Sequence, residues 1–406
     1  MTPLEPHDLI DPASTASVYV HFPYCTVRCR YGDFNVAIRS RVPAEPYTRA
    51  VLAEGEARAS AFSGRQLVSA YFGGGTPSLW GAVGVGEVIA GIRRWFPSRR
   101  EDLEITLEMN PAEASEACLA AYREVGVTRL SLGLQSLSDA SLERLYRNHS
   151  GADGLAALER ALRAGFSSVS ADLLFGLPDQ SLDDWTDDLT RVAATGVPHL
   201  SIYHLTVEAR TGLERAVSDG RLRLPTEDVA ASQWEAIEPM LRPFGLSGYE
   251  ISSYAAVGHK SRHNSGYWLG HAYLGLGAGA HSFQPPTAWH ASAVAERREN
   301  TRPHAEYLAT ALAGRDPLGW TEAVPVDVHL RERLFTGLRY RPGIDVVALL
   351  TELGGRPEPE LMGRLKRLTT DGFLEAVGSR LRLTPRGLSV ADSVAERIFE
   401  GAADRL

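Results

Sequence analysis

The chain has 406 residues, of which 44% are hydrophobic, so it can bury one large core and a smaller one, and two domains are expected. Its formal net charge of -8 argues against a general binder of nucleic acids or anionic membranes, because such proteins need a basic face. With 3 cysteines no disulfide framework can form, and no apolar run approaches the roughly 20 residues that span a bilayer. We therefore expect a cytosolic protein without a transmembrane segment.

From Val18 to Glu208 the sequence alternates short β-branched runs with amphipathic helical stretches. Strands are expected at residues 18–22, 67–72, 104–109, 129–134, 168–174 and 199–205. Helices are expected at residues 46–62, 112–125, 154–164 and 182–195, with Asp153 and Ser181 as N-caps. Six successive βα units predict a parallel sheet with right-handed crossovers. Because a closed TIM barrel needs eight units, we expect an open three-quarter barrel, with a doubly wound sheet as the alternative.

Polar residues fall at or near the carboxyl ends of five of these strands. They are Tyr19, the glycine run GGGTP at residues 73–77, Glu108, Gln135 and Asp172. Barrel enzymes place their chemistry at this end of the strands, because the loops there converge on one mouth. One such residue is more often structural, but five successive strands that each offer a polar group predict a common cavity.

A short cysteine-containing loop follows the first expected strand directly. Residues 25–34 read CTVRCRYGDF, so Cys25 and Cys29 have the first spacing of a C-x3-C-x2-C iron–sulfur loop. Thiolates are the preferred ligands for iron in such clusters, and a short loop can present several of them to one cluster. The position of the third ligand is occupied by Gly32, and the adjacent Asp33 offers only a harder oxygen ligand.

The sequence around this loop resembles a known family. The pattern Y-x-H-x-P-Y-C-x3-C-x-Y over residues 19–31 resembles the entry loop of radical S-adenosylmethionine (SAM) enzymes. More narrowly, the chain is similar to the HemN/HemW group, the coproporphyrinogen dehydrogenases and their haem-chaperone relatives. The segments SLGLQS, DLLFGLP and YEISSYA at residues 131–136, 172–178 and 249–255 match that group in order and spacing.

The resemblance implies a set of cofactors and a site for each. In that group the glycine motif cradles the amino end of SAM, and the cysteine loop holds a 4Fe–4S cluster. The implied metal ligands in this chain are Cys25 and Cys29. The implied SAM contacts are Tyr19, Tyr31, Gly74, Gly75, Thr76, Glu108, Gln135, Arg147 and Asp172.

Two features favour the HemW branch of the group. HemN-type enzymes carry a further cysteine where this chain has Phe34, and they have a longer extension before the cluster loop. The segment HNSGYW, which begins at His263, resembles the HNxxYW signature of HemW proteins, whose histidine is implicated in haem binding. Imidazole is a good axial ligand for haem iron. His281, at the end of the glycine-rich segment 275–281, is a weaker candidate ligand, and that segment is expected to be a tight structural loop.

The glycine at position 32 decides between the functions that the resemblance allows. Without a third thiolate we expect weak, partial or oxidation-prone cluster binding and little radical chemistry. The favoured function is a HemW-type chaperone that binds haem and passes it to haem-requiring respiratory proteins. The alternatives are a radical enzyme acting on coproporphyrinogen or another porphyrin, and a cofactor-free interaction scaffold.

The remaining expectations concern the division of the chain. We expect an N-terminal tail at residues 1–16, the barrel with a HemW-type extension at 17–283, a linker at 284–302 and a winged-helix-like domain at 303–406. This last domain should contain a β-hairpin at 373–384, and DNA binding is disfavoured because its acidic and basic residues nearly balance. Cys118 is expected to be a small buried hydrophobe on a helix outside the barrel.

Overall fold

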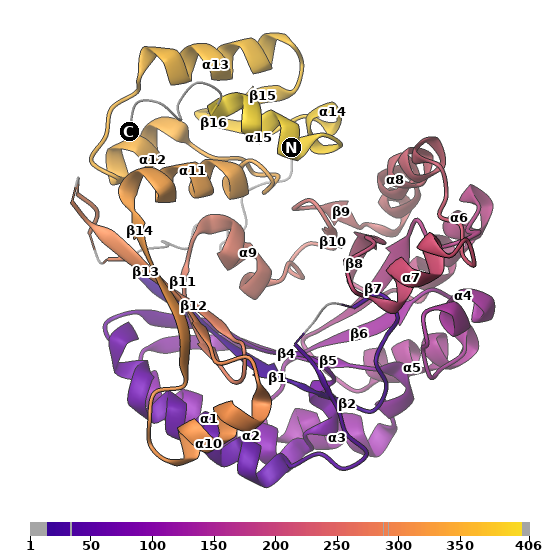
Figure 1. Ribbon diagram of the computed structural model, residues 1–406. Helices are drawn as coiled ribbons and strands as arrows, with labels where there is room; N and C mark the ends of the chain where they lie inside the picture. The colour runs from indigo at the N-terminus through magenta and orange to yellow at the C-terminus, as the bar shows by residue number, and fades with distance from the viewer. Residues whose placement is uncertain (1–13, 33–34, 287, 291, 400–406) are drawn as a thin grey trace.

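The computed structural model describes residues 14–32, 35–286, 288–290 and 292–399, and it is dominated by one curved sheet (Figure 1). The central strands run parallel in the spatial order β11 (Ala272–Leu276), β1 (Thr15–Phe22), β4 (Gln66–Gly74), β5 (Arg99–Met109), β6 (Arg129–Gln135), β7 (Ser168–Phe175) and β8 (His199–His204). Each of the six predicted strands is part of it. The residues 1–13, Asp33 and Phe34 lie outside the described part of the chain.

Antiparallel strands extend both edges of the parallel sheet. β10 (Ser253–Ala255) and β9 (Ser247–Gly248) follow β8, while β12 (His281–Gln284), β13 (Val294–Asn300) and β14 (Leu318–Pro325) follow β11. Within the described residues, β9 and β14 are the free edges of a 12-stranded sheet that curves without closing. The predicted open barrel is therefore confirmed.

Helices cover the convex face of the sheet, as Figure 1 shows for the barrel half. They are α1 (Ala44–Arg58), α2 (Ala82–Trp95), α3 (Glu116–Glu124), α4 (Asp139–Arg144), α5 (Gly151–Arg163), α6 (Leu182–Ala194), α8 (Glu227–Leu241) and, beside α1, α10 (His304–Leu312). α7 (Gly212–Ser218) lies next to the cysteine loop, where the N–H of Leu213 donates to the carbonyl of Arg30 at 2.9 Å. α9 (Arg262–Leu269) lies instead on the concave side. None of the described helices is long and apolar enough to cross a bilayer.

The helix starts test the two predicted N-caps. Ser181 caps α6: its hydroxyl accepts from the backbone N–H of Asp184, whose carboxylate accepts from the N–H of Ser181 in return. The prediction of Asp153 is wrong, because α5 begins earlier and is capped by Ser150. Asp153 is instead the third residue of α5, and its carboxylate completes the capping box by accepting from the N–H of Ser150 at 3.1 Å.

The apolar core lies between the sheet and its outer helices. β1 is buried almost throughout, and Trp185 of α6 is fully buried. Cys118 is only partly buried and packs against this core from α3, so it is less enclosed than expected.

The segment 284–302, predicted as a linker, contains β13 and is part of the sheet. Its polar composition hid a strand because its charged residues have acidic partners: Arg297 binds Glu322 across the strand pair at 2.9 Å, and Arg298 binds Asp316, just before β14, at 2.6 Å. β14 also belongs to the sheet, although residue 303 was the expected start of the C-terminal domain.

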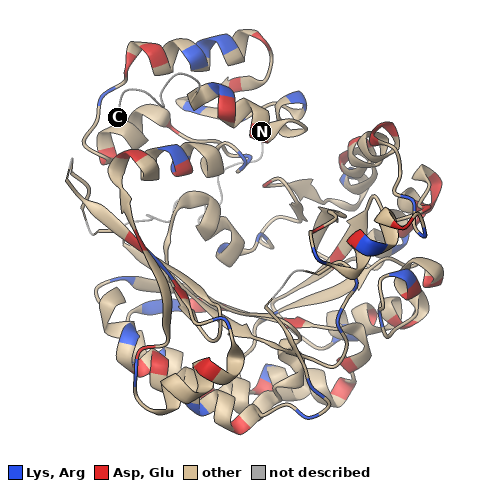
Figure 2. Ribbon diagram, in the orientation of Figure 1, with Lys and Arg blue, Asp and Glu red and all other residues tan. Residues whose placement is uncertain are grey.

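The C-terminal part has a core of its own. It consists of α11 (Val326–Gly337), α12 (Val346–Glu352), α13 (Pro359–Thr370), the hairpin β15 (Leu374–Val377) and β16 (Arg380–Leu383), α14 (Pro385–Leu388) and α15 (Ala391–Phe399). The predicted hairpin and the winged-helix-like character are confirmed. Figure 2 shows acidic and basic residues interspersed along these helices.

Candidate functional site

A cavity of about 740 Å³ opens at the carboxyl ends of the parallel strands. It brings together the residues that the sequence placed in one site: Tyr19, Cys25, Cys29, Tyr31, Gly32, Gly74, Gly75, Thr76, Glu108, Gln135, Arg147 and Asp172 all line it. Among the described residues, two candidate haem ligands lie outside this cavity: His263, on α9, and the weaker candidate His281. The spatial convergence follows from the parallel sheet, which aligns the ends of its strands at one mouth.

The glycines at residues 73–75 lie so close to neighbouring backbone and side-chain atoms that a side chain there would collide with them. Gly74 has a φ of +115° and its N–H donates to Glu108 Oε2 at 3.1 Å. A Cβ on Gly75 would lie 2.7 Å from the carbonyl oxygen of Tyr24 and 2.8 Å from Cys25 Sγ. Neither position accepts a side chain without a shift of its neighbours, so the run leaves open space at the floor of the cavity.

The cysteine loop presents two thiols to the cavity. Cys25 ends the short strand β2 (Tyr24–Cys25), which pairs with β3 (Ala37–Ile38). Thr76 Oγ1 donates to Cys25 Sγ at 3.4 Å, and burial raises the pKa of this thiol. Arg147 Nη1 donates to Cys29 Sγ at 3.3 Å.

The donor set does not fit a cluster held by three thiolates. Gly32 lines the same cavity as Cys25 and Cys29, so the third position faces the right space without a ligand atom. The described part of the chain contains no group of three histidine, cysteine or acidic side chains arranged to hold a metal ion. Cys118 on α3 is not among the residues that line the cavity and cannot substitute.

Two partly buried carboxylates face the cavity. Tyr71 OH donates to Glu108 Oε1 at 2.8 Å, and Ser131 Oγ donates to Asp172 Oδ1 at 3.0 Å. Burial raises the pKa of Glu108 to about 7, and the nearby Asp172 adds to the shift. Burial likewise raises the pKa of Asp172 to about 6, against the effect of its serine hydrogen bonds. Such groups can switch between accepting and donating hydrogen bonds near neutral pH.

Arg147 is anchored at the end of β6. Its Nη2 donates to Asn110 Oδ1 at 2.6 Å and to the carbonyl of Gly133 at 2.9 Å. The strand register shifts between Gly133 and Gln135, and Gln135 has a φ of +69°. A non-glycine residue in this left-handed region is strained, and such strain gathers at functional sites. The bulge turns the Gln135 side chain into the cavity.

Several lining residues were not identified from the sequence. Asn110, Tyr203 and Tyr71 belong to the cavity wall. Asn110 had a usable signal, since it follows Glu108 closely at the end of a strand. Tyr71 could have been found by strand alternation, because it lies on β4 two residues from Ser69, on the same face.

His263 is buried and already has partners for both ring nitrogens. Nδ1 lies 3.0 Å from Ser69 Oγ and Nε2 lies 3.0 Å from Tyr267 OH. Its backbone N–H donates to Glu104 Oε1 at 3.0 Å, which fixes the start of α9. Burial lowers the pKa of His263 to about 3, so the imidazole is neutral. Axial ligation of haem iron by this histidine requires that one of these hydrogen bonds opens.

The glycine-rich segment that ends at His281 is partly strand. Residues 272–276 form β11, which pairs with β1, and the turn that follows is tightly bonded: the N–H of Gly277 donates to Glu54 Oε2 at 2.9 Å. His281 itself is half-exposed, 3.9 Å from Glu299, and does not line the cavity at the strand ends.

Comparison with known proteins agrees with this geometry. Residues 19–192 match the radical SAM superfamily and residues 324–390 match the HemN C-terminal domain. A protein described as heme chaperone HemW from Mycobacterium tuberculosis (strain ATCC 25618 / H37Rv) is 35% identical over 394 residues, which cover 96% of each chain. The chain belongs to the HemW family.

Further relatives extend this assignment to HemW proteins of other bacteria. The heme chaperone HemW of Bacillus subtilis (strain 168) is 30% identical over 378 residues, covering 93% of this chain and 97% of that one. Among solved structures, coproporphyrinogen III oxidase (HemN) from Escherichia coli has a TM-score of 0.77 at 20% identity and covers 96% of this chain and 91% of that chain. At this identity the HemN likeness shows the fold alone. This member of the HemW family therefore has a HemN-like fold and a glycine at the position of the third cluster ligand.

Proposed function

We propose that this protein is a cytoplasmic haem chaperone of HemW type. It binds haem at the His263 region and delivers it to haem-requiring respiratory proteins. The observation that carries the proposal is full-length similarity to proteins described as heme chaperone HemW, at 35% identity over 96% of both chains. The HNxxYW-like segment that begins at His263 supports it, because it forms α9 on the concave side of the barrel.

The cavity at the strand ends is proposed to bind SAM. The residues that would hold it are Tyr19, Tyr31, Gly74, Gly75, Thr76, Glu108, Gln135, Arg147 and Asp172. The guanidinium of Arg147 suits a carboxylate, while the two partly buried acids suit an amino group and ribose hydroxyls. None of these contacts needs the missing thiolate.

The cluster site is proposed to be impaired. Cys25 and Cys29 supply two thiolates, and a radical SAM cluster, when fully ligated, supplies an electron for cleavage of SAM. We therefore assign no radical step to this chain. A coproporphyrinogen oxidase-like activity is disfavoured for the same reason, although the fold is HemN-like.

Titration with hemin tests the chaperone proposal. The purified protein should bind hemin stoichiometrically, as a Soret band distinct from that of free hemin, and His263→Ala should weaken binding. His290→Ala is the matched control, since His290 is an exposed histidine whose ring Nδ1 lies 3.1 Å from Ser292 Oγ. Absence of hemin binding by the unaltered protein would exclude the chaperone function and favour an interaction scaffold. Conversion of coproporphyrinogen with cleavage of SAM would favour the enzyme.

A further inference from the structure

A second cavity, of about 530 Å³, lies where the sheet extension meets the C-terminal domain. Its volume is within the range of small-molecule sites. The walls come from α9, β11, β12, β13, α11 and α15, and they share no residue with the cavity at the strand ends. The lining residues that matter below are Tyr267, Tyr273, Phe283, Arg297, His329 and Arg333.

Flat rings follow one another along this cavity. Tyr267 and Tyr273 lie 4.9 Å apart between centroids, and Tyr273 lies 6.2 Å from Phe283. Phe283 stacks on His329 with 5.5 Å between centroids, and Trp289 stacks on the same histidine at 4.4 Å with 12° between planes. A wall of this kind suits a flat aromatic ligand, because rings gain most from offset and edge-to-face contact.

His329 is the unusual residue of the cavity. Its side chain is 2% exposed, and its Nδ1 has no hydrogen-bond partner among the described residues. A buried polar atom without a partner costs free energy and calls for an explanation such as a ligand or ion. Stacking on Trp289 and Phe283 fixes the plane of the His329 imidazole. Any bond to a ligand must therefore form at the nitrogen atoms on the edge of this ring. Burial, with help from Arg333 and Arg297, lowers the pKa of His329 to about 3, so its nitrogen lone pair is available to a metal.

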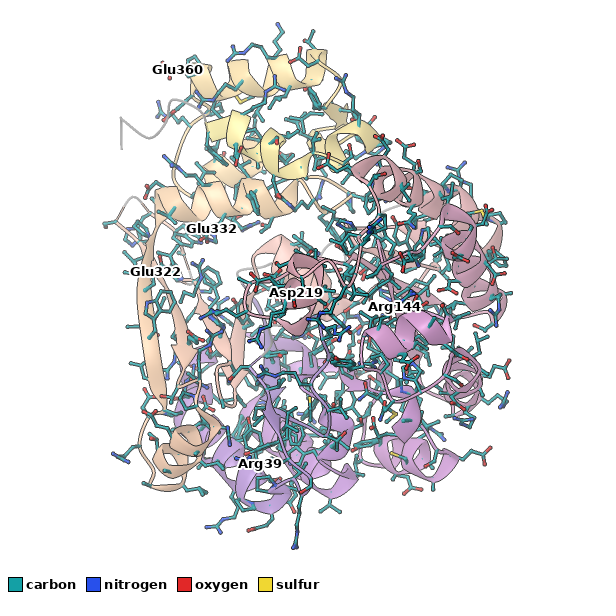
Figure 3. All side chains as sticks on the ribbon, turned by 45° about the vertical axis from the view of Figure 1, so that its right-hand side comes forward. Arg39, Arg144, Asp219, Glu322, Glu332 and Glu360 are labelled. Carbon is teal, nitrogen blue, oxygen red and sulfur yellow. The ribbon has the colours of Figure 1, made fainter. Side chains whose placement is uncertain are left out.

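The polar rim of the cavity is basic, in a chain whose formal net charge is -8. Arg297, Arg331 and Arg333 line it against one acid, Glu332. Arg297 binds Glu332 at 2.6 Å and Glu322 at 2.9 Å, both labelled at this junction in Figure 3. Among the described residues, the acidic partner of Arg333 is Glu352, at 3.6 Å. Guanidinium groups at the mouth of an aromatic slot suit a ligand with carboxylate side chains.

We propose that this cavity binds an iron porphyrin that carries carboxylate groups, with His329 as an axial ligand of the iron and Arg297 and Arg333 beside the carboxylates. The proposal rests on the proposed haem-chaperone function and names its binding site. His263 is then a positioning residue: its Nε2 lies 3.0 Å from Tyr267 OH, and Tyr267 forms part of the cavity wall. The HNxxYW-like helix thus shapes the pocket rather than ligating the metal.

The test is hemin titration followed by absorption and electron paramagnetic resonance spectra. His329→Phe keeps the aromatic stack but removes both nitrogens, so the spectral signature of nitrogen ligation should disappear and Kd should rise about tenfold or more. His263→Ala should weaken binding yet keep that signature. Thr336→Trp on α11 places bulk in the same cavity without touching His329 and should also abolish binding; His290→Ala should change nothing.

The outcomes separate this inference from the proposed function. If the unaltered protein binds no hemin, the chaperone function itself is wrong. If it binds hemin, and His329→Phe and Thr336→Trp both keep its spectrum with Kd within about twofold, the site is elsewhere and only this inference is overturned. Loss of the nitrogen signature in His263→Ala but not in His329→Phe would also overturn it and identify His263 as the ligand. If His329→Phe does not fold, hemin titration of Thr336→Trp alone decides whether hemin binds in this cavity.

Discussion

The ring of His263 stacks on that of Tyr71, with 4.9 Å between centroids and 26° between planes. The phenol of Tyr71 donates at the same time to Glu108 Oε1 at 2.8 Å. Ser69, two residues earlier on the same face of β4, lies 3.0 Å from His263 Nδ1. One strand therefore forms a wall shared by the predicted SAM cavity and the HNxxYW-like helix α9.

The raised pKa of Glu108 predicts a pH dependence of stability. Because burial raises the pKa from 4.5 to about 7, the folded protein binds more protons than the unfolded chain between these values, and the free energy of unfolding falls as pH rises from about 4.5 to about 7. The contribution of this residue should be on the order of 1 to 2 kcal/mol, since the cavity is open to water on one side.

Urea unfolding of the parent and of Glu108→Gln at pH 5 and pH 7.5 measures this effect. Glutamine keeps an acceptor oxygen for only one of the two donors, Tyr71 and Gly74, but it does not titrate. The lost hydrogen bond acts at both pH values, so the stability of the variant relative to the parent should be greater at the higher pH than at the lower one. An equal difference between the two proteins at both pH values would show that Glu108 titrates normally.

The glycine cradle predicts a selective loss of SAM binding. In Gly74→Ala the new Cβ would lie 2.6 Å from His21 Cε1 and 2.9 Å from the carbonyl oxygen of Phe22, at the floor of the cavity. We expect SAM affinity, measured by calorimetry, to fall about tenfold or more. Gly81→Ala is the control: Gly81 also has a positive φ, of +88°, but its Cβ would meet nothing within 4 Å. An equal loss of SAM affinity in the two variants would show that backbone strain alone causes the effect.

Local patterns in the sequence predicted the barrel and its main cavity well. Alternation of strand and helix periods located β1, β4, β5, β6, β7 and β8, though not the two-residue strands β2 and β3. Parallel strands bring their carboxyl ends together whatever the detailed packing. Features that depend on distant pairing were missed. β13 reads as a polar linker until Arg297 and Arg298 meet acids on neighbouring segments, and β11 reads as a glycine loop until it pairs with β1.

The partners of single side chains were equally out of reach. His263 looked like a free ligand because nothing in the sequence places Ser69 and Tyr267 at its two nitrogens. The same limit applies to Asp153, whose role as third residue of a capping box becomes visible only when the helix start at Gly151 is known. His329 carried no motif and gained meaning only from its burial between Phe283 and Trp289.

A buried ion cluster joins the barrel to the sheet extension and predicts a large loss of stability. The side chain of Glu54 is fully buried, pairs with Arg58, and accepts from Asn300 Nδ2 and Tyr307 OH, each at 2.7 Å. Glu54→Ala leaves the guanidinium and these donors unpaired, so the free energy of unfolding should drop by about 3 to 5 kcal/mol. Glu45→Ala, in an exposed pair on the same helix, should cost less than about 1 kcal/mol. Similar losses in the two variants would contradict the role of the cluster.

Restoring a thiol at position 32 should restore the cluster site. Gly32 lines the cavity beside Cys25 and Cys29, so Gly32→Cys places a third thiolate where the C-x3-C-x2-C spacing requires it. After anaerobic reconstitution, iron and sulfide per chain should be partial and lost in air for the parent, but complete and more stable for the variant. Gly32→Ser controls for the added bulk and should behave like the parent, because a hydroxyl is a poor ligand for cluster iron. Cys118→Ser should leave the cluster content of Gly32→Cys unchanged, since Cys118 lies on α3 and does not line the cavity. A complete and stable cluster in the parent would show that another group already serves as the third ligand.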